Sequence, residues 1–123
     1  MLTIYTYAKC STCRDAVKWL RAHNIAFAEK PIRETPPAPA ELRAMLAHQG
    51  GQLRRLFNTS GQDYRALGLK DKLPAMSEAE ALKLLSTNGN LVKRPFVLGR
   101  AKGGEIGMVG FKPEEWTAVL LQK

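Results

Sequence analysis

The chain has 123 residues, of which 45% are hydrophobic. This length suits one compact domain with a single core and argues against two domains. The 19 lysines and arginines outweigh the 11 aspartates and glutamates and give a formal net charge of +8, so the surface attracts anions. The basic residues are scattered along the chain and form no basic tail. We therefore expect no direct contact with nucleic acid.

The sequence contains only two cysteines, Cys10 and Cys13. Secreted domains stapled by disulfides carry more cysteines, spread along the chain. The N-terminal sequence MLTIYTYAKC lacks the charged and apolar regions of a signal peptide. No uncharged apolar stretch approaches the roughly 18 residues of a membrane span. These features predict a cytoplasmic protein, away from the membrane and monomeric, in which both thiols stay reduced until they are used.

The first third of the chain predicts a strand, a helix and a second strand. Residues 2–7 are β-branched and aromatic, which is typical of a strand. Over residues 11–23 the apolar residues recur at helical spacing, and Asn24 ends the pattern. Residues 25–32 indicate a second strand that ends near Pro31. The chain therefore opens with a βαβ unit, and Cys10 lies in its first loop.

The middle of the chain, about residues 36–90, predicts helices. Three prolines at 36, 37 and 39 precede a helix that closes at Gly50–Gly51. Residues 53–57 and 64–69 are expected to form short helical pieces on either side of a turn at residues 58–61. Ser77 and Glu80 have the spacing of a capping box and open a helix that ends near Asn88.

After Arg94 and Pro95 the pattern changes to that of a hairpin. Residues 96–98 and 106–109 predict two strands around a glycine-rich turn at residues 99–104. The sequence from Lys112 starts a last helix. We therefore predict a single mixed α/β domain over residues 1–123, with a helical insertion at about 36–90 between the second and third strands.

The spacing of Cys10 and Cys13 indicates thiol chemistry. Cys10 lies where the strand ends and the helix begins, and the free N–H groups and dipole there lower a thiol pKa. Cys13 lies one turn inside the helix on its apolar face, so it is better suited to resolve an intermediate. The pair can close a small disulfide. Arg14 follows Cys10 by four residues, on the same side of the first turn, where its charge would favour a thiolate or a bound oxyanion.

Two other interpretations of the cysteines compete with a redox site. A CxxC pair directly after the first strand of a βαβ unit predicts a thioredoxin-like redox site. The pair could instead be two ordinary cysteines, one of them in the core. A zinc site would need four ligands, and only His23 and His48 remain, without a partner pair. We expect these histidines to lie at the surface or its boundary, and we expect no bound metal or cofactor.

Four segments carry a family resemblance that covers nearly the whole chain. They are TIYTYAKCSTCRDAVKWL at the start, LFNTSGQDYRALGL in the middle, and LVKRPFVL and VGFKPEEW near the end. Together they resemble the ArsC/Spx family, the arsenate-reductase-like branch of the thioredoxin fold. The resemblance implies a thioredoxin-like mixed four-stranded sheet with a helical insertion between strands two and three.

The resemblance also implies roles for individual residues. Cys10 corresponds to the nucleophile, which attacks arsenate in the reductases before glutathione and glutaredoxin complete the cycle. Arg94 corresponds to an oxyanion-binding arginine, and Pro95 to the cis-proline that faces the active cysteine in this fold. Lys112 stands at the position of a further reductase arginine and keeps its charge without the bidentate fork. The reductant that this resemblance implies is either glutathione with glutaredoxin, or thioredoxin.

Besides Lys112, three further positions depart from the reductase pattern. The reductases have a serine where this chain has Cys13, and a second cysteine resembles the Spx-type regulators, in which CxxC is a redox switch and RNA polymerase is the partner. Ser60 replaces an arginine of the middle motif, and Thr6 replaces a histidine before the loop. Since a tetrahedral oxyanion needs several fixed donors, we expect poor arsenate reduction.

Three functions therefore stay open. The favoured one is a thiol-dependent reductase with Cys10 as nucleophile and Cys13 as resolving thiol, acting on arsenate, a disulfide or a glutathione adduct. The second is an Spx-like redox-switched transcriptional regulator that binds the alpha subunit of RNA polymerase. The third is a family member with a structural or binding role only.

Overall fold

The computed structural model describes residues 1–101 and 103–121 and contains one mixed four-stranded sheet in the order β2-β1-β3-β4. Strand β1 (Leu2–Thr6) pairs in parallel with β2 (Phe27–Pro31) and antiparallel with β3 (Phe96–Ala101). Strand β4 (Gly104–Val109) extends the sheet beyond β3 as an antiparallel hairpin. The predicted thioredoxin-like sheet with one parallel and two antiparallel pairings is confirmed.

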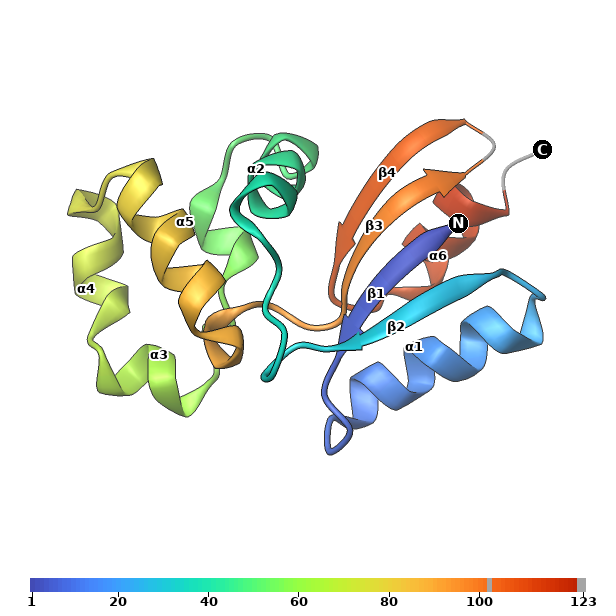
Figure 1. Cartoon of the computed structure of the whole chain (residues 1–123), viewed down its shortest axis with the longest axis horizontal. Helices are drawn as coiled ribbons and strands as arrows, with labels where there is room; N and C mark the ends of the chain where they lie inside the picture. The colour runs from blue at the N-terminus through green and yellow to red at the C-terminus, as the bar shows by residue number, and fades with distance from the viewer. Residues whose placement is uncertain (102, 122–123) are drawn as a thin grey trace.

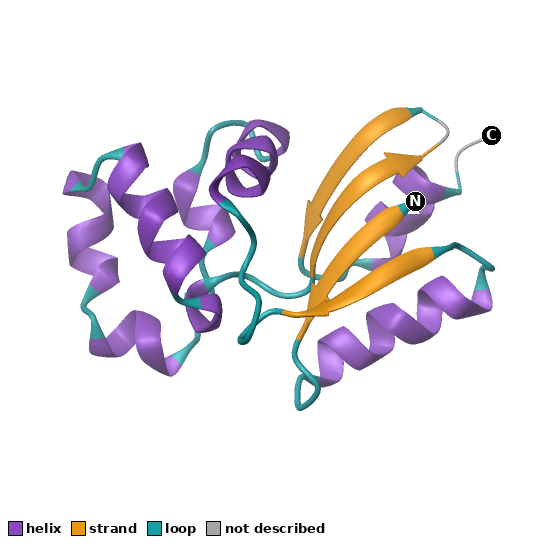
Figure 2. Ribbon diagram, viewed as in Figure 1, coloured by secondary structure: helices purple, strands orange, loops and turns teal. Residues whose placement is uncertain are grey.

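Helices flank this sheet in two groups (Figures 1 and 2). The first group is α1 (Ser11–Ala22) with α6 (Pro113–Leu120). The second is the helical insertion between β2 and β3: α2 (Pro39–His48), η1 (Leu53–Leu56), α3 (Gln62–Ala66), α4 (Leu69–Lys72), η2 (Leu73–Ala75), α5 (Glu78–Thr87) and η3 (Gly89–Leu91), where η marks a short 3-10 helix. Within the described residues, no helix has both the length and the apolar character needed to cross a membrane.

Successive side chains of the strands enter two different hydrophobic cores, as the alternation of a pleated sheet requires. Leu2 and Ile4 of β1 pack with α1 and with the fully buried Trp116 of α6. Tyr5 of the same strand, together with Phe96 of β3, packs into the core of the insertion. The two groups of helices therefore pack on opposite faces of the sheet.

Polar contacts also join the insertion to the sheet. The buried Tyr5 hydroxyl donates to Glu41 Oε1 of α2 at 2.7 Å, and Gln49 Nε2 donates to the carbonyl of Gly107 in β4 at 3.3 Å. At the other end of the insertion, Gly89 packs so closely on the segment after β2 that a Cβ atom would overlap the carbonyl oxygen of Ile32. These contacts fix the insertion against the sheet at β1, at β4 and at the segment after β2.

The structure corrects two details of the expected elements. The helical piece expected over residues 64–69 is instead the two helices α3 and α4, because Gly68 adopts a left-handed φ of 64° between them. Gly99, expected in the hairpin turn, lies inside β3 and pairs with Leu2 and Ile106, so the strands are longer than predicted. Residue 102 of that turn lies outside the described residues.

Candidate functional site

Cys10 is the N-cap residue of α1. Its backbone is extended, with φ −92° and ψ 114°, and its Sγ accepts a hydrogen bond from the backbone N–H of Cys13 at 3.3 Å. Its own N–H donates to the carbonyl of Tyr7 at 2.9 Å, which closes the short loop after β1. The sulfur therefore occupies the place where a capping oxygen normally meets the free N–H groups of a first helical turn.

The two thiols differ strongly in acidity. Burial raises the pKa of Cys10, but hydrogen bonds from the thiol and backbone N–H of Cys13, the charge of Arg94 and the N–H of Thr12 outweigh it, so the pKa lies below its ordinary value. Cys13 is only 1% exposed. Burial, reinforced by hydrogen bonding and charge at Cys10, raises the Cys13 pKa to about 12, although the Tyr7 backbone and Arg94 oppose the shift. Cys10 is thus the more acidic of the two thiols, and Cys13 is the hydrogen-bond donor to its sulfur.

Arg94 and Pro95 lie directly before β3, next to the cysteine loop. The Arg94–Pro95 peptide bond has the cis configuration that the resemblance implies. The guanidinium carbon of Arg94 lies 5.0 Å from the centroid of the Tyr7 ring, within the range of a cation–π contact. From this position its positive charge lowers the pKa of both cysteines.

Arg14 has a different contact from the one expected. Its Nη1 donates to the carbonyl oxygen of Ala8 at 2.9 Å, and its side chain lines a groove on the side of β2, together with Glu29. Although Arg14 lies on the first turn of α1, its long side chain folds back on the preceding loop. The charge that acts on the Cys10 sulfur comes from Arg94, and Arg14 braces the loop.

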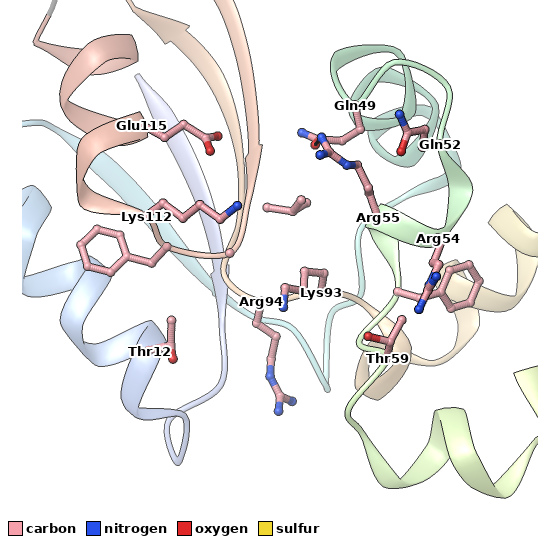
Figure 3. A pocket seen from close by; sticks show the side chains of 14 residues that line it. Thr12, Gln49, Gln52, Arg54, Arg55, Thr59, Lys93, Arg94, Lys112 and Glu115 are labelled. Atoms are coloured by element: carbon pink, nitrogen blue, oxygen red, sulfur yellow. Dashed lines mark hydrogen bonds between the residues drawn. The ribbon is translucent and has the colours of Figure 1, made fainter. Parts of the chain in front are cut away.

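A cavity of about 540 Å³ lies between the sheet and the insertion, next to the cysteine loop (Figure 3). Thr12 of α1 and Arg94 form its side nearest Cys10, and Lys112, at the start of α6, extends into it. Its charged lining residues are Arg54, Arg55, Lys93, Arg94, Lys112 and Glu115. The structure therefore brings two of the three predicted anion-binding residues, Arg94 and Lys112, to one cavity, and Arg14 lies outside its lining.

Sequence reasoning missed three of these cations. Arg54 and Arg55 form the centre of η1, and Lys93 precedes Arg94. The only sequence feature that could have pointed to them is the pair of adjacent basic residues in LRRLF and in LVKRPF. Such a short basic pair usually indicates only a solvated surface. Ser60, where the reductase pattern has an arginine, lines a second cavity of about 500 Å³ that also contains Arg94 and Tyr7.

The histidines lie apart from the cysteines. Both His23 and His48 are exposed, and the His48 ring lies against Gly107 of β4. In the part of the chain that the structure describes, no three His, Cys, Asp or Glu side chains gather as a metal site would require.

Comparison with known proteins identifies the family. The sequence matches the profile of the ArsC family over residues 5–119. The chain belongs to the ArsC family. It is 47% identical to the uncharacterized protein YusI of Bacillus subtilis over 115 residues, which cover 94% of both chains. It is also 31% identical to the global transcriptional regulator Spx of Enterococcus faecalis, over 94% of this chain and 83% of the relative.

A solved ArsC-like structure supports the same conclusion. The crystal structure of a possible arsenate reductase from Streptococcus mutans superposes with a TM-score of 0.82 at 43% identity, covering 94% of this chain and 96% of that one. Members of the family thus carry names of two kinds, transcriptional regulator and arsenate reductase. The chemistry of this chain has to be argued from its own site.

Proposed function

We propose that this protein is a thiol-dependent oxidoreductase in which Cys10 is the nucleophile and Cys13 the resolving thiol. One observation carries the proposal: the Cys10 sulfur caps α1 and accepts from the N–H of Cys13 at 3.3 Å, whereas Cys13, one turn further on, is 1% exposed. These surroundings lower the pKa of Cys10 and raise that of Cys13 to about 12. A thiolate is the attacking species in thiol–disulfide exchange. The partly exposed Cys10 is therefore the group that meets a substrate, and the buried Cys13 acts second.

In the first step, the Cys10 thiolate attacks one sulfur of a substrate disulfide. A new S–S bond joins Cys10 to one half of the substrate, and the other half leaves as a thiolate that takes a proton from water. The hydrogen bond from the Cys13 backbone N–H to Cys10 Sγ holds the attacking sulfur at the end of α1. Arg94 offsets the negative charge on this sulfur before the attack.

In the second step, Cys13 becomes the nucleophile. Once Cys10 is bound to substrate it carries no charge, so the contribution of the Cys10 thiolate to the high pKa of Cys13 is lost. Cys13 then attacks Cys10 Sγ, which forms the intramolecular disulfide and breaks the bond from Cys10 to the substrate. The Cys13 proton passes to the departing sulfur, which leaves as the second substrate thiol. Two electrons pass from the two cysteines to the substrate. Glutathione with glutaredoxin, or thioredoxin, then reduces the disulfide.

Arsenate is a poor substrate in this proposal. Attack on a tetrahedral oxyanion needs fixed donors around the developing charge. Of the charged positions that the reductase pattern uses, this chain keeps Arg94, has a lysine at 112 and a serine at 60. Lysine supplies a point charge where arginine would bind two oxygens at once.

A second function is favoured by one observation, the similarity to a global transcriptional regulator over 94% of the chain. In that function, the Cys10–Cys13 disulfide is a redox switch that controls binding to the alpha subunit of RNA polymerase. The same cysteine chemistry serves both functions. A pull-down with the isolated alpha subunit distinguishes the two functions. The regulator function predicts that the reduced and oxidised proteins bind this subunit differently.

Trapping the intermediate tests the oxidoreductase function. Wild-type protein treated with 2-hydroxyethyl disulfide should lose the mass of two hydrogens and regain it with dithiothreitol. Cys13→Ser should stop as a mixed disulfide on Cys10, and Cys10→Ser should stay unmodified because the remaining thiol is buried and protonated. A mixed disulfide on Cys13, or stable adducts on the wild-type protein, would contradict the assigned order of the two thiols.

A further inference from the structure

The cavity between the sheet and the insertion has an excess of positive charge. Five cations line it against a single carboxylate, that of Glu115, which leaves four positive charges without a counterpart. Figure 3 shows Lys112 extending into this space from the sheet side and Arg55 from the insertion side. Cations that line one cavity repel one another, and a bound anion relieves that repulsion.

The protein itself supplies little compensation. Among residues 1–101 and 103–121 the one ion pair is Arg100–Glu105, which lies in the β3–β4 hairpin. Arg55 Nη1 donates only to the neutral side-chain oxygen of Gln49, at 3.4 Å. The guanidinium and ammonium groups of the cavity thus keep most of their donors for a ligand.

The same cavity reaches the cysteine loop. Thr12, whose backbone N–H helps to lower the pKa of Cys10, lines it, and so does Arg94, whose charge acts on that sulfur. A molecule whose sulfur is bonded to Cys10 therefore has the cavity beside it. A volume of about 540 Å³ is of the size that small-molecule ligands occupy and exceeds what one tetrahedral oxyanion fills.

We infer that Arg54, Arg55, Lys93 and Lys112 form a subsite for the acid groups of a small disulfide substrate that carries at least two carboxylates or phosphates on one half. This inference rests on the proposed function and names its substrate class. In the exchange, the acidic half stays in the cavity and is bonded to Cys10, while the other half leaves as a thiol. Cys13 then displaces the acidic half as a thiol, so the two protein thiols supply both electrons.

A series of synthetic disulfides tests the charge requirement. The reduced full-length protein is mixed with 2-hydroxyethyl disulfide, which is neutral, with 3,3′-dithiodipropionate, which has one carboxylate on each half, or with the disulfide of mercaptosuccinate, which has two. The rate of Cys10–Cys13 disulfide formation is followed by acid quenching and mass spectrometry. Because complementary charge raises association rates by roughly 10-fold or more, we expect the rate to rise along the series and to fall with added salt.

Variants separate the cavity from the overall positive charge. Arg55→Gln and Lys93→Gln should each lower the rate with the mercaptosuccinate disulfide by about 10-fold, the effect of losing one charge-assisted contact. Their rates with the neutral disulfide should fall far less than that, and unchanged circular-dichroism spectra show that the variants fold. Arg43→Gln is the matched control, because it removes an exposed charge of α2 that lies outside the cavity lining.

Each other result has a distinct meaning. A flat series, or an Arg43→Gln loss as large as that of Arg55→Gln, overturns the subsite and leaves the oxidoreductase function standing. Failure of the neutral disulfide to oxidise the wild-type protein overturns the oxidoreductase function and the subsite with it. Competition by succinate compared with glycerol phosphate then shows whether carboxylates or phosphates fit the subsite better.

Discussion

The sheet region and the helical insertion act on the cysteine site in different ways. In the sheet region, the groups that lower the pKa of Cys10 are the thiol and N–H of Cys13, the charge of Arg94 just before β3, and the N–H of Thr12. The insertion instead supplies Arg54 and Arg55, which are distant in sequence and reach the cavity only through the fold. The first region generates the nucleophile, and the second shapes what can approach it.

The two regions also have separate hydrophobic cores. The core between the sheet, α1 and α6 contains Leu20 and Trp116, which are fully buried, whereas that of the insertion contains Leu42, Met45 and Leu85. Only the sheet belongs to both. A change inside the insertion is therefore expected to alter stability and substrate choice more than it alters the chemistry of the two thiols.

The largest expected effect concerns arsenate and the second cavity. Ser60→Arg places a guanidinium beside Arg94, in the cavity that both positions line. Since one preorganised donor is worth roughly 10²–10³-fold in rate, we expect arsenate reduction to rise by about 10²-fold in an assay coupled to glutathione and glutaredoxin. Ser60→Gln, which adds length without charge, should show no gain. Rapid turnover of arsenate by the wild-type protein, with no gain from Ser60→Arg, would show that the missing arginine was never needed.

The next largest effect is on the packing of the insertion. Gly89→Ala places a methyl group against the carbonyl of Ile32. The atoms that this methyl group meets are backbone atoms, so the chain has to shift. We expect a loss of about 2–3 kcal/mol in the free energy of unfolding, measured by urea denaturation. Gly50→Ala is the control: its φ is +69° but its surroundings are open, so only about 1 kcal/mol should be lost. Equal losses in the two variants would refute the close approach at Gly89.

A smaller effect is expected at Cys10 when Arg94 is changed. Arg94→Gln removes a positive charge that favours the thiolate, so the pKa of Cys10 should move up. The rate of reaction with iodoacetamide would then reach its half-maximum at a higher pH than in the wild-type protein. Arg33→Gln is the matched control, because Arg33 also lies 5.0 Å from the Tyr7 ring but does not act on the Cys10 sulfur. Equal shifts in both variants would contradict the assignment to Arg94.

The smallest expected effect tests whether the insertion can be weakened without altering the thiols. Ser77 caps α5 by accepting from the N–H of Glu80 at 3.1 Å, and Glu80 Oε1 accepts from the N–H of Ser77 at 3.2 Å. Ser77→Ala should cost about 1 kcal/mol of stability. The iodoacetamide profile of Cys10 should stay where it is. A shift of that profile would mean that the two regions are more tightly coupled than their separate cores indicate.

Local patterns allowed much of the fold to be predicted. The helix over residues 11–22 and the sheet strands follow from periodicities that neighbouring residues impose, and the cap position of Cys10 follows from its place between strand and helix. The split at Gly68 was missed, because a glycine inside a helical pattern is often tolerated and only its left-handed φ in the fold ends α3. The extension of β3 through Gly99 was missed, because pairing with Leu2 of β1 keeps this residue in the strand despite the glycine-rich sequence.

In the candidate site, too, the features set by neighbouring residues were predictable and those set by the fold were not. The roles of Cys10 and Cys13 were predicted from the four residues of the CxxC motif and its place between strand and helix, whereas the position of Arg94 came from family resemblance. Arg14 was misplaced because helical spacing fixes where a side chain starts and leaves a long arginine free to turn toward Ala8. Arg54 and Arg55 could not be assigned because their neighbours in space are far away in sequence.

The hydrogen bond between Tyr5 and Glu41 constrains how the sequence can evolve. Glu41 accepts from the buried Tyr5 hydroxyl at 2.7 Å and from the N–H of Ala38 at 2.9 Å, so one carboxylate serves a strand and a helix start. Loss of Glu41 alone leaves a buried hydroxyl without an acceptor, at a cost of about 1–3 kcal/mol. Tyr5→Phe removes that hydroxyl and makes the carboxylate dispensable to the strand. Among descendants of this sequence, position 41 is therefore free to vary mainly after position 5 has become phenylalanine, and the order of the two mutations matters.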